Sequence, residues 1–137
     1  MRFTVVNEKE LIEEVYSKLK GKLSAPHKVA LVGDLGAGKT ALVRGLCDKL
    51  GVRDVVTSPT FVILREYNGS KNLPIQHLDL YRLSHQSTDQ EVIEYIEDEK
   101  YLTFVEWPEN LKFGLENYDT IIKIINHGDD QREVQIS

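Results

Sequence analysis

Several features that mark other protein classes are scarce in this chain of 137 residues. It has one cysteine, Cys47, and so cannot form an internal disulfide. No apolar run approaches the roughly 18 residues that a transmembrane helix needs, which argues against a membrane span. The first residues, Met1–Val6, lack the apolar stretch and cleavage site of a secretory signal. These absences predict a cytoplasmic protein that does not associate with a membrane.

Clusters of basic residues are also missing. Lys and Arg number 17 against 22 Asp and Glu, which gives a net charge of −5. Nucleic acids are bound chiefly through clustered Lys and Arg, so this charge balance argues against a chain that binds nucleic acid without the help of another subunit. We therefore expect little or no direct nucleic-acid binding, and in any pathway that involves nucleic acid another subunit should carry most of the contact.

The most informative segment present is a glycine loop, G-x-x-x-x-G-K-T, which follows the apolar run Val29–Val32. Glycines allow a tight turn whose N–H groups point at a phosphate, the lysine can reach the β- and γ-phosphates, and the threonine hydroxyl can bind Mg²⁺. The apolar run predicts a buried strand, and residues 39–50 predict a helix with Leu42, Leu46 and Leu50 on one face. This context predicts a P-loop that binds ATP and Mg²⁺. The residues expected around the nucleotide are Gly33, Asp34, Leu35, Gly36, Ala37, Gly38, Lys39, Thr40 and Ala41.

The rest of the pattern predicts an α/β fold. A helix begins after the N-cap Asn7 and stops at Gly21, and the acidic segment Asp89–Lys100 predicts a surface helix. Asn68-Gly69 is the expected turn of a hairpin, and one or two helical turns are expected in Pro108–Phe113. Strands are expected over residues 2–6, 61–67, 75–81, 101–106, 119–126 and 132–136. Together these elements predict one P-loop-type domain over residues 1–137, with a central, mostly parallel sheet, antiparallel hairpin additions and helices in three layers.

Two carboxylates follow apolar strands and are candidates for phosphate chemistry. Asp79 is either a Mg²⁺ ligand, direct or through water, or a surface residue at the end of a strand. Glu106 either orients an attacking water, completes the metal shell or marks the strand exit. His77 shares a strand face with Asp79, but a lone histidine is more often packed or hydrogen-bonded than a ligand.

Two further candidates are less specific. Trp107 is placed to stack on the nucleotide, to dock a partner or to pack within the protein. The segment Thr57-Ser-Pro-Thr60 follows the helix of the glycine loop, where a hydroxyl can contact Mg²⁺ or the γ-phosphate and act as a switch. The same segment is also typical of an ordinary turn.

The order of these motifs resembles the bacterial TsaE family, formerly called YjeE, of small P-loop ATPases required for threonylcarbamoyladenosine modification of tRNA. The resemblance runs from the first helix to residue 110 and is carried by four segments: Gly33–Thr40, Thr57–Phe61, His77–Arg82 and Glu106–Glu109. One departure lies in residues 89–95, where the family usually has a glycine before its aromatic residue and this chain has none. That departure bears on a local turn and a partner contact, and not on the nucleotide site.

The resemblance implies a role for each matching residue and a set of partners. Lys39, Thr60 and Glu106 are the expected catalytic residues, and Thr40, Asp79 and Glu106 the expected metal ligands, with Trp107 beside the glutamate. The implied partners are two paralogous subunits, TsaB-like and TsaD-like. One of them transfers the threonylcarbamoyl group to adenosine 37 of tRNAs that read ANN codons. The implied role of this subunit is to reset or drive that cycle by ATP hydrolysis.

Three activities stay open from the sequence. ATP is favoured over GTP because the chain has no N-K-x-D motif to read guanine. The leading prediction is an accessory ATPase that is slow alone, since no obvious arginine finger is present. The alternative is a small-molecule P-loop kinase, although residues 83–100 hold Lys100 as their only Lys or Arg, too few for a lid. A third is a nucleotide-dependent adaptor, which Asp79 and Glu106 argue against.

Overall fold

The computed structural model describes residues 1–54 and 64–137, so the predictions for Thr57–Thr60 and for the first part of the strand at 61–67 lie outside the described residues. The described residues form a seven-stranded sheet with the order β1-β7-β6-β2-β5-β4-β3. Its strands are β1 (Arg2–Val5), β2 (His27–Gly33), β3 (Leu64–Gly69), β4 (Leu73–Asp79), β5 (Leu102–Glu106), β6 (Thr120–Asn126) and β7 (Arg132–Ile136). The helices are α1 (Glu8–Leu19), α2 (Lys39–Lys49) and α3 (Gln90–Glu97), with short 3₁₀ turns η1 (Ser70–Asn72), η2 (Pro108–Asn110) and η3 (Leu115–Asn117).

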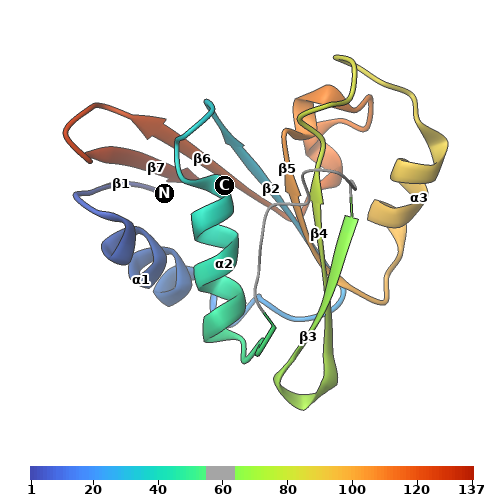
Figure 1. Cartoon of the computed structure of the whole chain (residues 1–137), viewed down its shortest axis with the longest axis horizontal. Coiled ribbons are helices and arrows are strands. Elements are labelled where there is room, and N and C mark those ends of the chain that lie inside the picture. The colour runs from blue at the N-terminus through green and yellow to red at the C-terminus, as the bar shows by residue number, and fades with distance from the viewer. Residues whose placement is uncertain (55–63) are drawn as a thin grey trace.

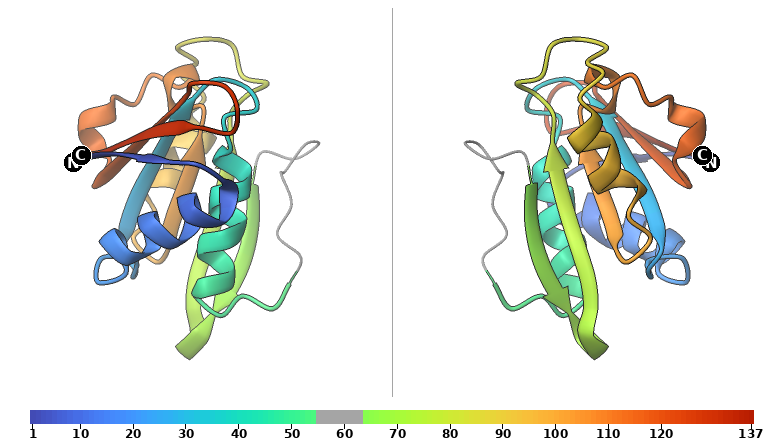
Figure 2. Two further views of the ribbon diagram at one scale, coloured as in Figure 1. Left: turned by 90° about the vertical axis from the view of Figure 1, so that its left-hand side faces the viewer. Right: turned by 90° about the vertical axis from the view of Figure 1, so that its right-hand side faces the viewer.

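The sheet is parallel at its centre and antiparallel at its margins. Strands β6, β2, β5 and β4 run parallel, whereas the β1–β7, β6–β7 and β3–β4 pairs are antiparallel. Helices α1 and α2 cover one face of the sheet and α3 covers the other (Figures 1 and 2). The predicted three-layer α/β architecture is therefore confirmed. Within the described residues, no helix is long and apolar enough to cross a membrane.

Helices α1 and α3 start at side-chain caps. The Asn7 side chain accepts a hydrogen bond from the Glu10 N–H at 2.7 Å, and the Asp89 side chain accepts one from the Val92 N–H at 3.2 Å. Helix α3 ends at Glu97, short of the predicted Lys100. Asp98 is extended there, and its carboxylate accepts the Lys100 N–H at 3.0 Å. Such a local side-chain bond competes with continuation of the helix.

The turn between β3 and β4 lies further along the chain than predicted, so Asn68-Gly69 as the turn was wrong. Gly69 is still extended within β3, and the turn has Lys71 and Asn72 at its centre, both with a φ of 58°. Two adjacent positive φ values are the mark of a type I′ hairpin turn. A Cβ at residue 69 would lie 2.8 Å from the carbonyl oxygen of Leu50. The glycine therefore permits close packing of β3 on the end of α2.

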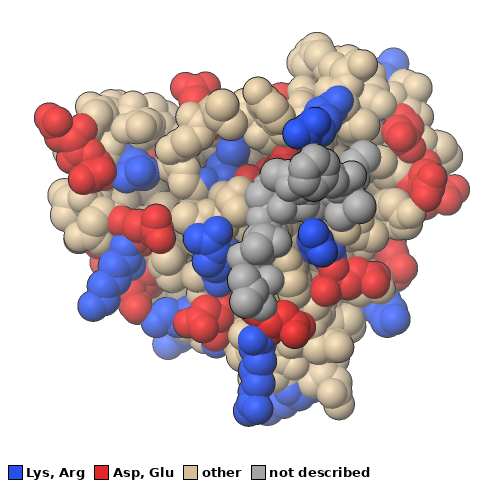
Figure 3. Space-filling model, in the orientation of Figure 1, with Lys and Arg blue, Asp and Glu red and all other residues tan. Residues whose placement is uncertain are grey.

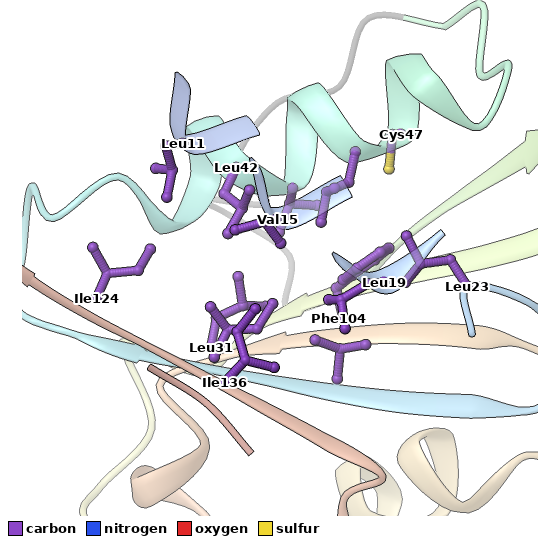
Figure 4. Close-up of a cluster of buried hydrophobic side chains, with 14 of the residues drawn as sticks. Leu11, Val15, Leu19, Leu23, Leu31, Leu42, Cys47, Phe104, Ile124 and Ile136 are labelled. Atoms are coloured by element: carbon purple, nitrogen blue, oxygen red, sulfur yellow. The ribbon is translucent and has the colours of Figure 1, made fainter. Parts of the chain in front are cut away.

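Apolar side chains form a cluster on each face of the sheet. The cluster under α1 and α2, part of which Figure 4 shows, includes Leu11, Val15, Leu31, Leu42, Cys47, Phe104 and Ile124. The cluster under α3 includes Ala30, Leu78, Val92, Ile96 and Val105. Neighbours such as Ala30 and Leu31 serve opposite faces because side chains alternate along a strand. Cys47 lies in the core as predicted, and burial raises the pKa of its thiol to about 12.

Leu42 tests how strongly this packing supports the helix that carries the glycine loop. Its side chain is fully buried on α2. Leu42→Ala is expected to lower the free energy of unfolding by about 2–5 kcal/mol, because it removes buried methyl groups and leaves a cavity. Leu115→Ala is the control, since Leu115 is 40% exposed and its loss should change stability by less than about 0.5 kcal/mol. Urea denaturation measures both, and equal effects would contradict the assignment of Leu42 to the core.

Charged side chains of both signs are interspersed on the face shown in Figure 3. Lys and Arg lie next to Asp and Glu over this face, and acidic side chains are present on the side where α3 lies as well as on the opposite side. On that helix Glu91, Glu94 and Glu97 are exposed. This distribution is in keeping with the low expectation of direct nucleic-acid binding, which stays a prediction.

Candidate functional site

The carboxyl ends of three parallel strands bring the candidate residues to one edge of the sheet. Strand β5 lies between β2 and β4, and Glu106 at its end is in register with Leu31 of β2 and with Asp79 of β4. Gly33 ends β2 at the same edge. In open parallel sheets this edge is where ligands bind. Segments that are far apart in the sequence thus meet where the sequence predicted a site.

The glycine loop has the backbone of an anion site. Gly36 and Gly38 have φ values of 81° and 111°, a conformation that residues with a side chain rarely adopt. The Ala37 N–H donates to the Asp34 carbonyl at 3.0 Å, and α2 begins at Lys39 immediately after the loop. The free N–H groups of a helix N-terminus and the positive end of its dipole favour a bound phosphate.

Lys39 is held at the mouth of this loop. Its side chain is 5% exposed, its Nζ donates to the Gly33 carbonyl, and Nζ lies 3.7 Å from the centre of the Trp107 ring. Burial lowers the pKa of the ammonium, and nearby carboxylates oppose that shift. These carboxylates are Glu106, Glu109, Asp79 and Asp34. Lys39 is therefore a buried cation surrounded by acidic groups at the loop where a phosphate would bind.

Glu106 is the most enclosed carboxylate of the site. It is 2% exposed and accepts hydrogen bonds from two sides. The Thr40 hydroxyl donates to Oε1 and Oε2 at 2.8 and 3.0 Å, and His77 Nε2 lies 2.5 Å from Oε2. Asp79 is half-buried at the end of β4, where its Oδ1 accepts the Tyr81 N–H at 3.1 Å. The predicted strand Ile75–Tyr81 is thus two residues too long at this end, since β4 stops at Asp79.

These oxygen atoms suit Mg²⁺. The Thr40 hydroxyl and the Glu106 carboxylate are hard ligands that already touch each other, and Asp79 lies beside Glu106 in register. Residues 1–54 and 64–137 contain no group of three or more His, Cys, Asp and Glu side chains that could enclose a metal alone. Mg²⁺ does not need one, because it is usually bound through one or two carboxylates together with substrate phosphates and waters. The residues present therefore fit a magnesium ion that binds with a phosphate ligand.

The Trp107 ring contacts Lys39 at the glycine loop and the Tyr81 ring toward the surface. Its backbone has a φ of 59°, and its ring lies 5.1 Å from the Tyr81 ring at an interplanar angle of 54°. Tyr81 is 51% exposed, whereas Trp107 is half-buried against Lys39. Packing within the protein, one of the three alternatives for Trp107, is therefore observed. Stacking on a nucleotide and docking of a partner stay predictions.

The structure adds one residue that the sequence did not single out for the site. Arg132 Nε donates to the Ala37 carbonyl of the glycine loop at 2.8 Å, and its Nη1 donates to the Asp130 carbonyl at 2.8 Å. No local motif marks this arginine, because its contact depends on where β7 lies. His77 was weighed from the sequence because it shares a strand face with Asp79, and the hydrogen-bonded role, one of the alternatives given there, is observed. Thr60 lies outside the described residues, and Ala41 lies in the first turn of α2.

Comparisons with known proteins agree with one another. Residues 6–134 match the family model described as "Threonylcarbamoyl adenosine biosynthesis protein TsaE". The chain is 36% identical over 135 residues to the tRNA threonylcarbamoyladenosine biosynthesis protein TsaE of Bacillus subtilis, covering 98% of this chain and 83% of that protein. It is 46% identical over 92 residues to the Synechocystis protein of the same name, covering 61% of this chain and 55% of that protein. The crystal structure of Bacillus subtilis YdiB superposes with a TM-score of 0.75 at 32% identity, covering 99% of this chain and 83% of that one.

Proposed function

Because this chain belongs to the TsaE family of threonylcarbamoyladenosine biosynthesis proteins, we propose that it is a Mg²⁺-dependent ATPase that serves as an accessory subunit in that tRNA modification. One observation carries the proposal: the glycine loop lies directly against a buried carboxylate, with the Thr40 hydroxyl 2.8 Å from Glu106. A buried carboxylate at this position can both help to hold Mg²⁺ and align an attacking water, and the loop itself does neither of these. The acid supplies the part that hydrolysis requires in addition to binding.

Binding is the task of the loop and of Lys39. The N–H groups of the loop and of the first turn of α2 would hold the phosphate oxygens of ATP. The Lys39 ammonium would contact the β- and γ-phosphates as a point charge. Thr40, Glu106 and Asp79 would hold Mg²⁺, which, when bound, neutralises negative charge on the phosphate oxygens.

Hydrolysis is the task of Glu106. Its carboxylate is placed to accept a hydrogen bond from an attacking water and so to align that water with the γ-phosphate. Thr60 is proposed as a switch that senses the γ-phosphate, on the strength of its motif alone. Among the remaining candidates, Trp107 would flank the nucleotide through its contact with Lys39.

Proposed partners follow from the family resemblance and from the charge of the chain. We propose that the protein acts with TsaB-like and TsaD-like subunits, one of which transfers the threonylcarbamoyl group to tRNA. The net charge of −5 supports a subunit that makes little or no contact with tRNA itself.

Phosphate release from ATP tests this proposal. The chain alone is expected to hydrolyse ATP slowly, and addition of the two partner subunits with tRNA should raise kcat at least tenfold, since a stabilising group supplied by another protein is typically worth about 10³–10⁵ in P-loop enzymes. The rate should also require Mg²⁺ and fall to background when the ion is removed by a chelator. The measurement is the release of inorganic phosphate with and without each component.

Three outcomes would contradict the proposal. Full-rate hydrolysis by the chain alone would remove the dependence on partners. Transfer of phosphate to a small molecule in place of water would favour the kinase alternative. Tight ATP binding with no hydrolysis under any combination of components would favour the adaptor.

A further inference from the structure

His77, two residues before Asp79 on β4, is fully buried and lies against the Glu106 carboxylate. His77 has 0% exposure, and in the sheet it is in register with Phe104 of the neighbouring strand β5. Glu106 lies two residues beyond Phe104 on the same face of β5. The His77 side chain is therefore within reach of Glu106 without belonging to the glycine loop.

The contact involves one particular ring nitrogen. Nε2 of His77 lies 2.5 Å from Oε2 of Glu106, whereas Nδ1 is buried and has no hydrogen-bond partner among the described residues. With an ionised carboxylate, which can only accept hydrogen bonds, the geometry requires that Nε2 carry the hydrogen and donate it. In the described part of the chain, Glu106 is thus the one group that this ring hydrogen-bonds.

The two donors to Glu106 come from different parts of the fold. Thr40 reaches the carboxylate from the start of α2, and His77 reaches it from β4. A buried carboxylate cannot turn toward water without losing these bonds, so its donors determine its orientation. Thr40 is part of the phosphate loop, whereas His77 is part of the sheet. His77 can therefore hold Glu106 in place whether or not the loop is engaged.

We propose that His77 is a positioning residue, which holds the Glu106 carboxylate in the orientation that aligns the attacking water. This inference rests on the proposed ATPase function and extends it to a residue outside the glycine loop and the proposed metal ligands. Groups that orient a functional side chain from behind typically change activity by about 10–100-fold when they are replaced. Loss of the Nε2 donor should therefore lower kcat by about 10–100-fold and leave the KM for ATP and the affinity for ADP unchanged.

Two amide substitutions separate positioning from simple packing. His77→Gln places an amide nitrogen near the position of Nε2, whereas His77→Asn places one near the position of Nδ1. We expect His77→Gln to keep most of the wild-type kcat and His77→Asn to lose about 10–100-fold. Phosphate release gives kcat and KM, calorimetry gives the ADP affinity, and thermal unfolding shows that both variants fold. A wild-type kcat in His77→Asn, or equal losses in the two variants, would overturn the inference.

A proton NMR measurement keeps this inference distinct from the proposed function. A buried Nε2–H proton that donates to a carboxylate should resonate at low field in the wild-type chain and be absent from that region in Glu106→Ala. If the wild type with its partners releases no phosphate, the ATPase proposal fails and the role in aligning water fails with it. If phosphate is released but the resonance is missing, or survives in Glu106→Ala, only the assignment of His77 fails.

Discussion

Lys39→Ala is expected to weaken ATP binding by roughly 10- to 150-fold, which corresponds to the 1.5–3 kcal/mol of a hydrogen bond from a charged group. The substitution removes the buried ammonium that lies among acidic groups at the mouth of the glycine loop. Because the contact is to the phosphates, ADP binding should weaken as well. Calorimetric titration with ATP and ADP in Mg²⁺ measures the change.

A second lysine on the same helix provides the matched control. Lys49 lies at the far end of α2 and pairs with Glu13 at 2.7 Å on the surface. Lys49→Ala should leave both affinities unchanged, although it removes the same charge from the same helix. Thermal unfolding without nucleotide should confirm that Lys39→Ala folds despite the loss of the contact with Trp107. Equal ATP affinity in the wild type and Lys39→Ala would contradict the phosphate site.

Glu106→Ala is expected to lower kcat by about 10²–10⁴-fold, the usual effect of removing a group that accepts a proton from an attacking water. ADP should still bind, because the loop N–H groups and Lys39 are intact. The contrast between lost turnover and retained binding is what identifies a hydrolytic role. Single-turnover phosphate release and ADP titration measure the two properties on the same preparation.

The control for this prediction is a carboxylate remote from the loop. Glu94 is exposed on α3, and Glu94→Gln should change neither turnover nor binding. Loss of ADP binding in Glu106→Ala would show that the carboxylate serves the binding of the nucleotide. Unchanged turnover in that variant would show that another group aligns the water.

The glycine loop could be predicted from the sequence because its requirements are local. A strand, glycines that accept positive φ and a helix that starts at the lysine all lie within Val29–Lys49. The cap at Asn7 and the burial of β5 were predictable for the same reason. The turn at Asn68-Gly69 was predicted wrongly because a glycine serves close packing as well as turns, and the local pattern does not distinguish the two uses.

The contacts that complete the site could not be predicted because they depend on strand order. The sequence marks Asp79 and Glu106 as strand-end acids, but it does not state that β5 enters between β2 and β4. That placement puts Glu106 against Thr40 and His77. The contact of Arg132 with the glycine loop likewise depends on the position of β7 at the margin of the sheet.

The insertion of β5 between β2 and β4 also has a consequence for when the contacts of Glu106 form during folding. The bonds that Glu106 makes to Thr40 and His77 span 66 and 29 residues of the chain. Parallel strands cannot be joined by tight turns, and such distant pairings form late because their loop-closure entropy must be overcome first. An emerging chain that ends before β5 would contain the glycine loop but not Glu106, the carboxylate proposed to align water. Under the proposed function, hydrolysis would therefore require β5 to be in place between β2 and β4.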